Sequence, residues 1–470
     1  MNLQNLTIKK ARALLDKKQI SAKELADFYL KNIEAKNKEL NAYLEVYDDV
    51  LQQAETAQKI IDKGEAKSLT GIPLAIKDNI LIKGRKVSGA SKMLQNYHAT
   101  YTATAAQKLI NQGAIFLGRV NMDEFAMGAS TENSAFGVTK NPHDPERVAG
   151  GTSGGSAVVV AADMSVFGIG SDTGGSVRQP SSFCGVVGLK PTYGAVSRYG
   201  LMAMGSSLDC IGAATKTVED SETVFNCIKG RDEMDSTSQE AKKPRRKEGK
   251  IKIGIPYHIL EQEGISKEVK ENFDENIKKL KDLNFEIVDI RLPNIDKSLA
   301  VYYIVMPAEA SSNMARYDGI KYGMSVDGKN LLEVYKKTRG EGFGKEVRRR
   351  IILGTYVLSS GYYDAYYGKA MLARKIIRTE FEEAFKRVDA ILTPTTPSPA
   401  FKIGEKSTPL EMYLADIFTV TANIVGCPAI SLLSGFAKVD GKNLPLGIQL
   451  MAPHMYEQIL FEIGKKFLQE

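Results

Sequence analysis

The stretch Ser165-Val-Phe-Gly-Ile-Gly-Ser-Asp-Thr-Gly-Gly-Ser-Val-Arg-Gln-Pro180 joins a short apolar run to a glycine-rich turn. Short apolar runs bounded by turn residues are typical of buried strands. Comparable runs occur at 72–76, 114–117, 251–255, 285–290, 390–394 and 429–433, and helical patterns separate most of them. This alternation predicts an α/β fold with a largely buried sheet, in which glycine-rich turns at strand ends carry the functional site.

We expect a single domain over 1–470. It comprises a helical segment at 1–65, a core at 71–212, an exposed charged loop or linker at 231–250, and the rest of the α/β core at 251–470. Two domains divided near residue 240 are the alternative. A capping box, Ser21-Ala-Lys-Glu24, predicts the start of a helix. Further helices are expected at about 42–63 and from about Glu457.

The composition excludes several classes of protein. With 43% hydrophobic and 25% charged residues, the chain resembles an ordinary globular protein and not a disordered one. No run of ~18 uncharged apolar residues or signal peptide is recognised, so we expect no membrane association. The net charge of +7 permits a polyanionic partner without requiring one. Four cysteines without a C-x-x-C pair indicate a reduced, cytoplasmic compartment, and four histidines without H-E-x-x-H predict no metal site.

A lysine closes the first apolar strand, in Gly71-Ile-Pro-Leu-Ala-Ile-Lys77-Asp-Asn-Ile. Burial disfavours the charged form of a lysine and lowers its pKa. A desolvated Lys77 would therefore serve as a base. The alternative is a lysine that extends to water or pairs with Asp78.

Gly150-Gly-Thr-Ser-Gly-Gly-Ser156 precedes the small apolar run Ala157–Ala162 and predicts a glycine-rich turn that opens a helix. It is not a Walker loop, because no Gly-Lys-Ser/Thr follows. It also matches G-x-S-x-G, which would make Ser153 the nucleophile of an α/β-hydrolase with His258 or His454 as its base. Chance matches are common in so glycine-rich a stretch, so this alternative is not favoured.

The turn at 170–180 places a serine among consecutive backbone amides. A hydroxyl beside such donors suits acyl transfer, because nucleophile and oxyanion stabiliser lie together. The expected oxyanion donors are the backbone N–H groups of Thr173, Gly174, Gly175 and Ser176. Because histidines are few, we hypothesise a relay in which Lys77 draws the proton of Ser176 through Thr152. A purely structural glycine turn is the alternative.

Together GIPLAIKDNI, GGTSGGSA and DTGGSVRQP resemble the three ordered motifs of the amidase signature family. Segments such as VYYIVMPAEASSNMARYDGIKYG and DIFTVTANIVGCPAISL are similar to the A subunits of tRNA-dependent amidotransferases. The resemblance implies a mixed sheet with helices on both faces. It implies that Ser176 forms the acyl-enzyme, that Lys77 is the terminal base, and that Thr152 stands where the family has a bridging serine after a cis peptide bond.

The resemblance further implies that the substrate is glutamine. Its α-carboxylate would bind Arg349, its α-ammonium would bind Asp416, and Tyr302 would lie at the rim of the pocket. Neighbouring helical residues point ~100° apart, so at most one of the arginines at 348–350 is expected to enter the pocket.

No nucleotide-binding loop is recognised in this chain, so we expect no cofactor here. By resemblance, ATP and Mg²⁺ belong to a partner, the B subunit, which also makes most contacts with the misacylated tRNA, and a small C subunit completes a heterotrimer. The basic run at 242–247 is interpreted as a solvated loop. A stand-alone amidase and a non-catalytic assembly subunit, the latter prompted by Thr152, are the alternative functions.

Overall fold

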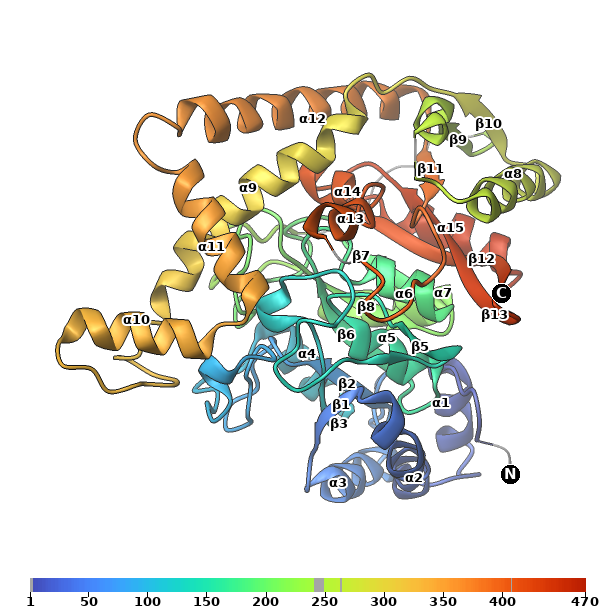
Figure 1. Ribbon diagram of the computed structural model, residues 1–470. Coiled ribbons are helices and arrows are strands. Elements are labelled where there is room, and N and C mark those ends of the chain that lie inside the picture. The colour runs from blue at the N-terminus through green and yellow to red at the C-terminus, as the bar shows by residue number, and fades with distance from the viewer. Residues whose placement is uncertain (1–2, 241–248, 263, 407) are drawn as a thin grey trace.

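Eleven strands from both halves of the chain form one mixed sheet (Figure 1). The computed structural model describes residues 3–240, 249–262, 264–406 and 408–470. In spatial order the strands are β1 (Tyr43–Val46), β3 (Ile115–Val120), β2 (Pro73–Lys77), β6 (Phe167–Asp172), β8 (Cys210–Thr215), β7 (Val187–Lys190), β12 (Ala429–Val439), β13 (Lys442–Met451), β11 (Ala390–Pro394), β9 (Lys252–Ile255) and β10 (Glu286–Asp289). A separate pair joins β4 (Lys140–Asn141) to β5 (Asp144–Val148).

Strand direction changes across the sheet. β2 runs parallel to β3 and β6, and β9 runs parallel to β10 and β11. The other neighbours are antiparallel. Parallel strands bury both faces, which explains why the strands at 73–77 and 167–172 read as apolar runs without alternation. The predicted α/β class with a mixed, buried sheet is confirmed.

Helices cover both faces. One apolar core takes side chains from α1 (Ile8–Asp16), α2 (Ala22–Leu40), α3 (Val50–Asp62), α4 (Thr104–Asn111), α5 (Gly154–Ala161), α6 (Arg178–Cys184), α7 (Val218–Ile228), α8 (Lys267–Asp282) and α15 (Glu457–Leu468). The opposite core takes them from α9 (Ser298–Asn313), α11 (Lys345–Val357), α12 (Lys369–Arg387) and α14 (Val420–Val425). Two further helices, α10 (Leu331–Gly342) and α13 (Pro409–Leu414), lie outside these cores.

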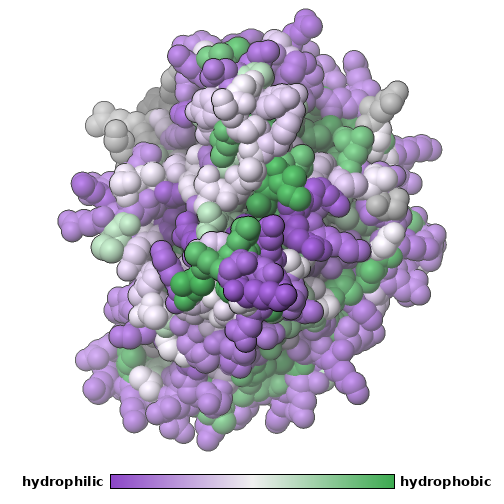
Figure 2. Space-filling model, turned by 60° about the vertical axis from the view of Figure 1, so that its left-hand side comes forward, coloured by the Kyte–Doolittle hydropathy of each residue, from purple (hydrophilic) through white to green (hydrophobic). Residues whose placement is uncertain are grey.

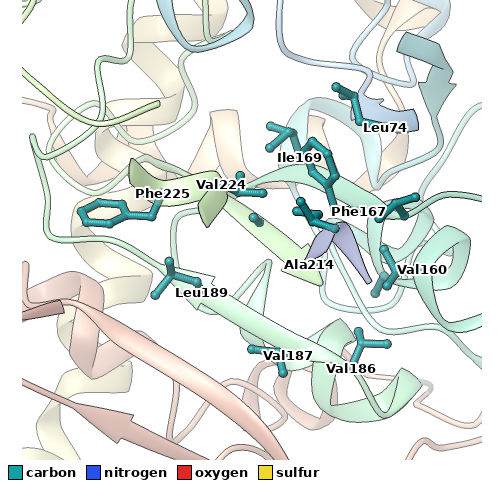
Figure 3. Close-up of a cluster of buried hydrophobic side chains, with 14 of the residues drawn as sticks. Leu74, Val160, Phe167, Ile169, Val186, Val187, Leu189, Ala214, Val224 and Phe225 are labelled. Atoms are coloured by element: carbon teal, nitrogen blue, oxygen red, sulfur yellow. The ribbon is translucent and has the colours of Figure 1, made fainter. Parts of the chain in front are cut away.

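Neighbouring residues of one strand reach opposite cores. In β11, Leu392 joins the first core and Ile391 the second, as the two-residue repeat of a strand requires. Figure 3 shows side chains of the first core around the central strands, among them Phe167 and Ile169 of β6 and Val160 of α5. This packing fixes the strands whose ends carry the site.

The helical predictions near the N-terminus were partly right. Ser21 and Glu24 form the expected capping box at the start of α2. The helix expected over 42–63 was wrong in its first part, because residues 43–46 form the edge strand β1, which pairs with β3. Pairing with a distant strand outweighed the local helical pattern there. The C-terminal helix begins at Glu457 as predicted.

The charged stretch at 231–250 is only partly described, since residues 241–248 lie outside the described residues. The first residues of the stretch are largely exposed, as expected of a loop, but two of its carboxylates bind neighbouring side chains. Asp235 is buried and accepts a hydrogen bond of 3.1 Å from the Arg198 guanidinium, while Asp232 accepts one of 2.6 Å from Ser197. The single-domain interpretation stays a prediction. None of the described helices combines the length and the apolar character that a membrane span needs.

Helices α9 and α11 approach so closely that a glycine is required between them. A Cβ on Gly354 would lie 1.8 Å from the carbonyl oxygen of Pro307. We therefore expect Gly354→Ala to lower the free energy of unfolding by about 2–3 kcal/mol, measured by urea denaturation. Gly340→Ala is the matched control, because a Cβ on this α10 glycine meets nothing within 4 Å. It should leave stability equal or slightly higher; equal losses for both variants would contradict the close approach.

Candidate active site

Lys77 is the last residue of β2, and its neighbour β6 ends at Asp172. Because the two strands are parallel, their carboxyl ends meet at the same edge of the sheet. The Lys77 side chain is fully buried there. The sheet topology therefore brings the lysine beside the turn that follows β6.

The Lys77 amine lies among hydroxyl groups. Its Nζ is 2.7 Å from Thr152 Oγ1, 2.8 Å from Ser153 Oγ and 3.0 Å from Ser171 Oγ. Burial lowers the pKa of Lys77 to about 7, although the nearby carboxylates of Asp123, Asp172 and Asp209 oppose the shift. The lysine neither extends to water nor pairs with Asp78, and a large fraction of it is a neutral base near pH 7.

The glycine-rich turn at 150–156 opens α5, as the sequence indicated. The peptide bond between Gly151 and Thr152 is cis, which confirms that prediction. The Gly151 amide donates to Gln179 Oε1 at 2.8 Å. Thr152 and its neighbour Ser153 both contact the lysine, so these two adjacent residues direct their hydroxyl groups to the same amine.

Ser176 lies in the turn between β6 and α6 with 7% of its surface exposed. The buried Asp172 carboxylate holds this turn, accepting from the amides of Gly175 at 2.9 Å and Val177 at 3.1 Å. It also pairs with Arg178 at 2.9 Å. Burial alone would raise the pKa of Asp172, but the Arg178 guanidinium outweighs it and lowers that pKa to about 2. The carboxylate is thus a permanent anchor for the loop.

Three of the four expected oxyanion amides remain without a protein acceptor. Among the residues that the structure describes, no hydrogen bond joins the amides of Thr173, Gly174 or Ser176 to a protein acceptor. Gly175 is the exception, because its amide donates to Asp172. Its φ of +127° also requires glycine, since the backbone is then in a region that side chains disfavour. Gly175 is therefore better described as a shaping residue than as an oxyanion donor.

Direct contacts join the two glycine-rich turns to each other and to the other half of the chain. The Ser153 amide donates to the Ser176 carbonyl at 2.9 Å. The Thr419 hydroxyl donates to the Gly174 carbonyl at 2.7 Å. Tyr302 lies against the same loop, where a Cβ on Gly174 would be 2.7 Å from its hydroxyl. Tyr302 is buried, and its place at the rim of a substrate pocket stays a prediction.

Of the arginines at 348–350, Arg350 and not Arg349 points inward. The Arg349 side chain is 42% exposed and pairs with Glu346, whereas Arg350 is 2% exposed. Arg350 Nε donates to Glu346 at 2.8 Å, and its guanidinium lies 5.7 Å from the Tyr303 ring centroid. Among these three residues only Arg350 turns inward, in line with the expectation of at most one; the binding role expected of Arg349 stays a prediction.

Asp416 lies beside this arginine in a buried setting. Its carboxylate accepts a hydrogen bond of 3.0 Å from the Tyr303 hydroxyl. Burial raises the pKa of Asp416 to about 7, against the opposing effects of Tyr303 and Arg350. Its carbonyl accepts from the amide of Thr419, the residue that binds Gly174, at 3.0 Å. Asp416 is thus linked through Thr419 to the Ser176 turn, and Tyr303 contacts both Asp416 and Arg350.

Neither histidine proposed as the base of an α/β-hydrolase is bonded to Ser153. His258 contacts the Leu292 carbonyl and His454 the Val425 carbonyl, each at 3.1 Å, whereas Ser153 contacts Lys77. Two cavities of about 610 and 680 Å³ lie along α12 beside Arg378, and Lys77 lines neither of them. Among the described residues no group of three or more histidine, cysteine or acidic side chains is arranged to hold a metal ion.

Sequence reasoning missed several residues of this cluster. Arg350, Tyr303 and Thr419 come from the second half of the chain, and Asp172 and Arg178 flank the nucleophile loop. A signal for Arg350 was present, because Val347, Gly354 and Val357 share its buried helix face. Spacings of three and four residues place Arg350 on that face and Arg349 off it.

Comparisons with known proteins identify the family of this chain. The Amidase family profile matches residues 24–461. The A subunit of the glutamyl-tRNA(Gln) amidotransferase of Thermoanaerobacter pseudethanolicus is 51% identical, over 100% of this chain and 97% of that protein. The crystal structure of the corresponding A subunit from Thermotoga maritima is 41% identical with a TM-score of 0.81, and the match covers 99% of this chain and 95% of that one. The peptide amidase of Stenotrophomonas maltophilia has the same TM-score at 26% identity, over 98% and 96%. This chain therefore belongs to the amidase signature family and groups within it with the amidotransferase A subunits.

Proposed function

We propose that this chain is the glutamine-hydrolysing subunit of a tRNA-dependent amidotransferase. The observation that carries the proposal is the contact of a buried, weakly basic Lys77 with Thr152, beside the loop of Ser176. Full-length identity of about half to amidotransferase A subunits supports the same assignment. The name of those relatives supplies Glu-tRNA(Gln) as the acceptor that the complete enzyme amidates.

The hydroxyl contacts orient the lone pair of neutral Lys77. Ser153 donates its own proton to the Ser171 carbonyl at 3.0 Å, so its oxygen accepts from the lysine. Asn79 donates to Ser171 Oγ at 2.9 Å, and a second lysine N–H can be directed to this oxygen. Two N–H groups are thus occupied, which leaves the lone pair for the proton of Thr152.

The reaction follows from this order of donors. Ser176 Oγ attacks the side-chain carbonyl carbon of glutamine while its proton passes to Thr152 and the Thr152 proton passes to Lys77. The free amides of Thr173, Gly174 and Ser176 stabilise the oxyanion. The relay returns a proton to the leaving nitrogen, which departs as ammonia and leaves a glutamyl ester on Ser176. Water, deprotonated through the same relay, hydrolyses the ester to glutamate.

The pair of Arg350 and Asp416 fits the zwitterionic end of glutamine. In this proposal Arg350 takes the role first expected of Arg349, because its guanidinium, which pairs with Glu346, is buried and a guanidinium fork suits a carboxylate. Asp416 holds the α-ammonium, and binding of that cation favours the ionised carboxylate. A stand-alone amidase for apolar amides has no use for such a pair, so this pair favours glutamine.

Ammonia does not amidate a carboxylate without activation. We propose that ATP and Mg²⁺ act in a partner, the B subunit, which also binds the misacylated tRNA, and that a small C subunit completes the complex. The names of the relatives, which designate an A subunit, support the existence of these partners. In this arrangement the present chain needs no cofactor of its own.

Ammonia release from glutamine tests the proposal, with the complex of all three subunits as the sample. Ser176→Ala should lower the rate by at least ~10³-fold, because no acyl-enzyme can form. A glutamine-like electrophile should label the unmodified protein at Ser176 and leave the variant unlabelled. Equal ammonia release from both proteins would exclude the nucleophile. No release and no labelling in either would instead favour a non-catalytic assembly subunit.

A further inference from the structure

Three polar side chains lie deep in the protein beside the Ser176 turn, and the proposed relay gives them no role. Polar residues normally stay at the surface, and hydrophilic side chains predominate on the face shown in Figure 2. Thr173, Asp209 and Asn423, by contrast, are each exposed by 3% or less. Burying such groups costs free energy unless their donors and acceptors are bonded, so the contacts they make indicate what they hold in place.

Asp209 lies directly opposite Thr173, because β6 and β8 are antiparallel and Asp172 pairs with the residue that follows Asp209. The Thr173 hydroxyl donates to the Asp209 carboxylate at 2.7 Å. That carboxylate also accepts from the amides of Met204 at 2.9 Å and Gly205 at 3.1 Å. Burial raises the pKa of Asp209 to about 6, so the group is mainly ionised at neutral pH and accepts all three bonds.

Asn423 of α14 holds the peptide group that joins Asp172 to Thr173. Its side-chain N–H groups donate to the carbonyls of Asp172 at 3.1 Å and Leu208 at 3.3 Å. Its Oδ1 accepts from the Arg178 guanidinium at 2.7 Å. Because a guanidinium only donates, this contact fixes which end of the amide faces the two carbonyls. One side chain thus links the end of β6 to the segment before β8.

The Asp172 carbonyl and the Thr173 N–H belong to one planar peptide group. Holding the carbonyl and the side chain that follows therefore fixes the direction of this N–H, which donates to no protein acceptor in the described parts of the chain. A hydrogen bond to the carbonyl also polarises the peptide group and strengthens its N–H as a donor. Donors that are fixed before the reaction need no reorganisation when the oxyanion forms.

We propose that Asn423 and Asp209 are positioning residues for oxyanion stabilisation. They hold the peptide group between Asp172 and Thr173 so that its N–H is aligned with the oxyanion before glutamine binds. The inference rests on the proposed function, in which Ser176 attacks the side-chain amide of glutamine. In this role neither side chain touches the substrate, so their loss should slow the reaction without weakening the binding of glutamine.

Kinetics of the complete three-subunit complex test this role. Asn423→Ala should lower kcat for ammonia release by about 30-fold and change KM by less than about threefold. A boronic acid that carries the amino-acid end of glutamine forms a tetrahedral adduct with Ser176, which places an oxygen at the oxyanion position. Its affinity should fall by about the same factor as kcat. The affinity for glutamate, which forms no such adduct, should stay within about threefold.

Asn141→Ala is the matched control. Asn141 is buried and donates to the carbonyls of Val148 at 3.1 Å and Phe183 at 2.9 Å. It accepts from the His143 amide at 2.9 Å, so its bonds match those of Asn423 in number and direction without contacting the turn at 173–176. The control should lose stability in thermal unfolding as Asn423→Ala does, but it should retain its kcat.

Thr173 provides a second test if Asn423→Ala is unstable. Thr173→Val removes the hydroxyl that binds Asp209 and should lower kcat by about tenfold. Thr173→Ser keeps the hydroxyl and should be several times faster than Thr173→Val. If both variants of the pair fold, Thr173→Val combined with Asn423→Ala should cost less than the product of the two single effects, because both act on one peptide group.

Three results would overturn the proposal: an unchanged kcat in a folded Asn423→Ala, an equal loss of kcat in Asn141→Ala, or a rise in KM at constant kcat. Retained ammonia release in Ser176→Ala would instead contradict the proposed function. Loss of release in Ser176→Ala together with an unaffected Asn423→Ala would contradict the positioning role alone, so the two failures are distinguishable.

Discussion

Lys77→Met will abolish most ammonia release without unfolding the protein. The variant keeps the length and apolar character of the side chain but removes the base, so kcat should fall by at least ~10³-fold. Methionine needs no desolvation of an amine, and the melting temperature should be equal or higher. Lys190→Met is the control, because Lys190 is equally buried and donates to the Pro191 carbonyl away from the relay. A comparable loss of kcat in that variant would show a structural effect.

The lowered pKa of Lys77 should make both kcat/KM and the stability of the protein depend on pH. Because only the neutral amine accepts a proton, kcat/KM of the unmodified enzyme should rise with pH through about 7 and then level off. The pKa of Lys77 lies below its unfolded value of 10.5, so the unfolded chain binds more protons between these two values. The stability contributed by this residue should consequently increase with pH across that window. Lys77→Met should lose both slopes.

Variants of the bridging position show whether the relay runs through Thr152. Thr152→Val preserves the shape but removes the hydroxyl, and kcat should fall by about 10²–10³-fold. Thr152→Ser should stay close to the unmodified rate, because it retains the hydroxyl. Ser153→Ala should cost less, since the Ser153 proton is donated to the Ser171 carbonyl. An active Thr152→Val together with an inactive Ser153→Ala would move the bridge to Ser153.

Arg350→Lys will weaken the use of glutamine far more than Arg349→Ala. Lysine keeps the charge and the partner Glu346 but loses the planar fork, so kcat/KM for glutamine should fall by about 30–100-fold, mainly through KM. Arg349→Ala should change KM by less than about threefold, because that side chain is 42% exposed and an ion pair open to solvent contributes little. Steady-state ammonia release at several glutamine concentrations provides both constants.

A truncated substrate completes this comparison. An amide that lacks the α-carboxylate has nothing to gain from Arg350, so the unmodified protein and Arg350→Lys should process it at similar low rates. If Arg349→Ala lowered kcat/KM for glutamine more than Arg350→Lys did, Arg349 and not Arg350 would bind the α-carboxylate.

The features that local sequence determined were predictable. Lys77 was placed correctly because a strand and its terminal residue depend on a short apolar run, and parallel pairing then fixes which edge of the sheet it reaches. The cis bond before Thr152 and the helix after it follow from one motif. The glycine-rich turn already indicated Ser176 as a candidate, whereas Asp416 came from the family resemblance alone.

Other features depend on contacts between distant segments. Residues 43–46 carry a helical pattern but become β1 because β3 offers an open edge. The choice of Arg350 over Arg349 depends on which side of α11 meets α9, and the tyrosine over which Arg350 lies comes from that neighbouring helix. The role of the Gly175 amide depends on the Asp172 carboxylate, which accepts a hydrogen bond from this amide three residues later in the chain. The residue pattern of one segment does not reveal which distant segment it contacts.

The proposed mechanism assigns bond cleavage and choice of substrate to different stretches of this chain. The lysine, the threonine and the serine of the proposed relay all lie before residue 180, whereas the pair proposed to bind the amino-acid end of glutamine lies after residue 345. Substitutions in the later stretch can therefore change the amide substrate while the lysine, threonine and serine are retained. Such a separation is consistent with a peptide amidase that has the same fold at 26% identity.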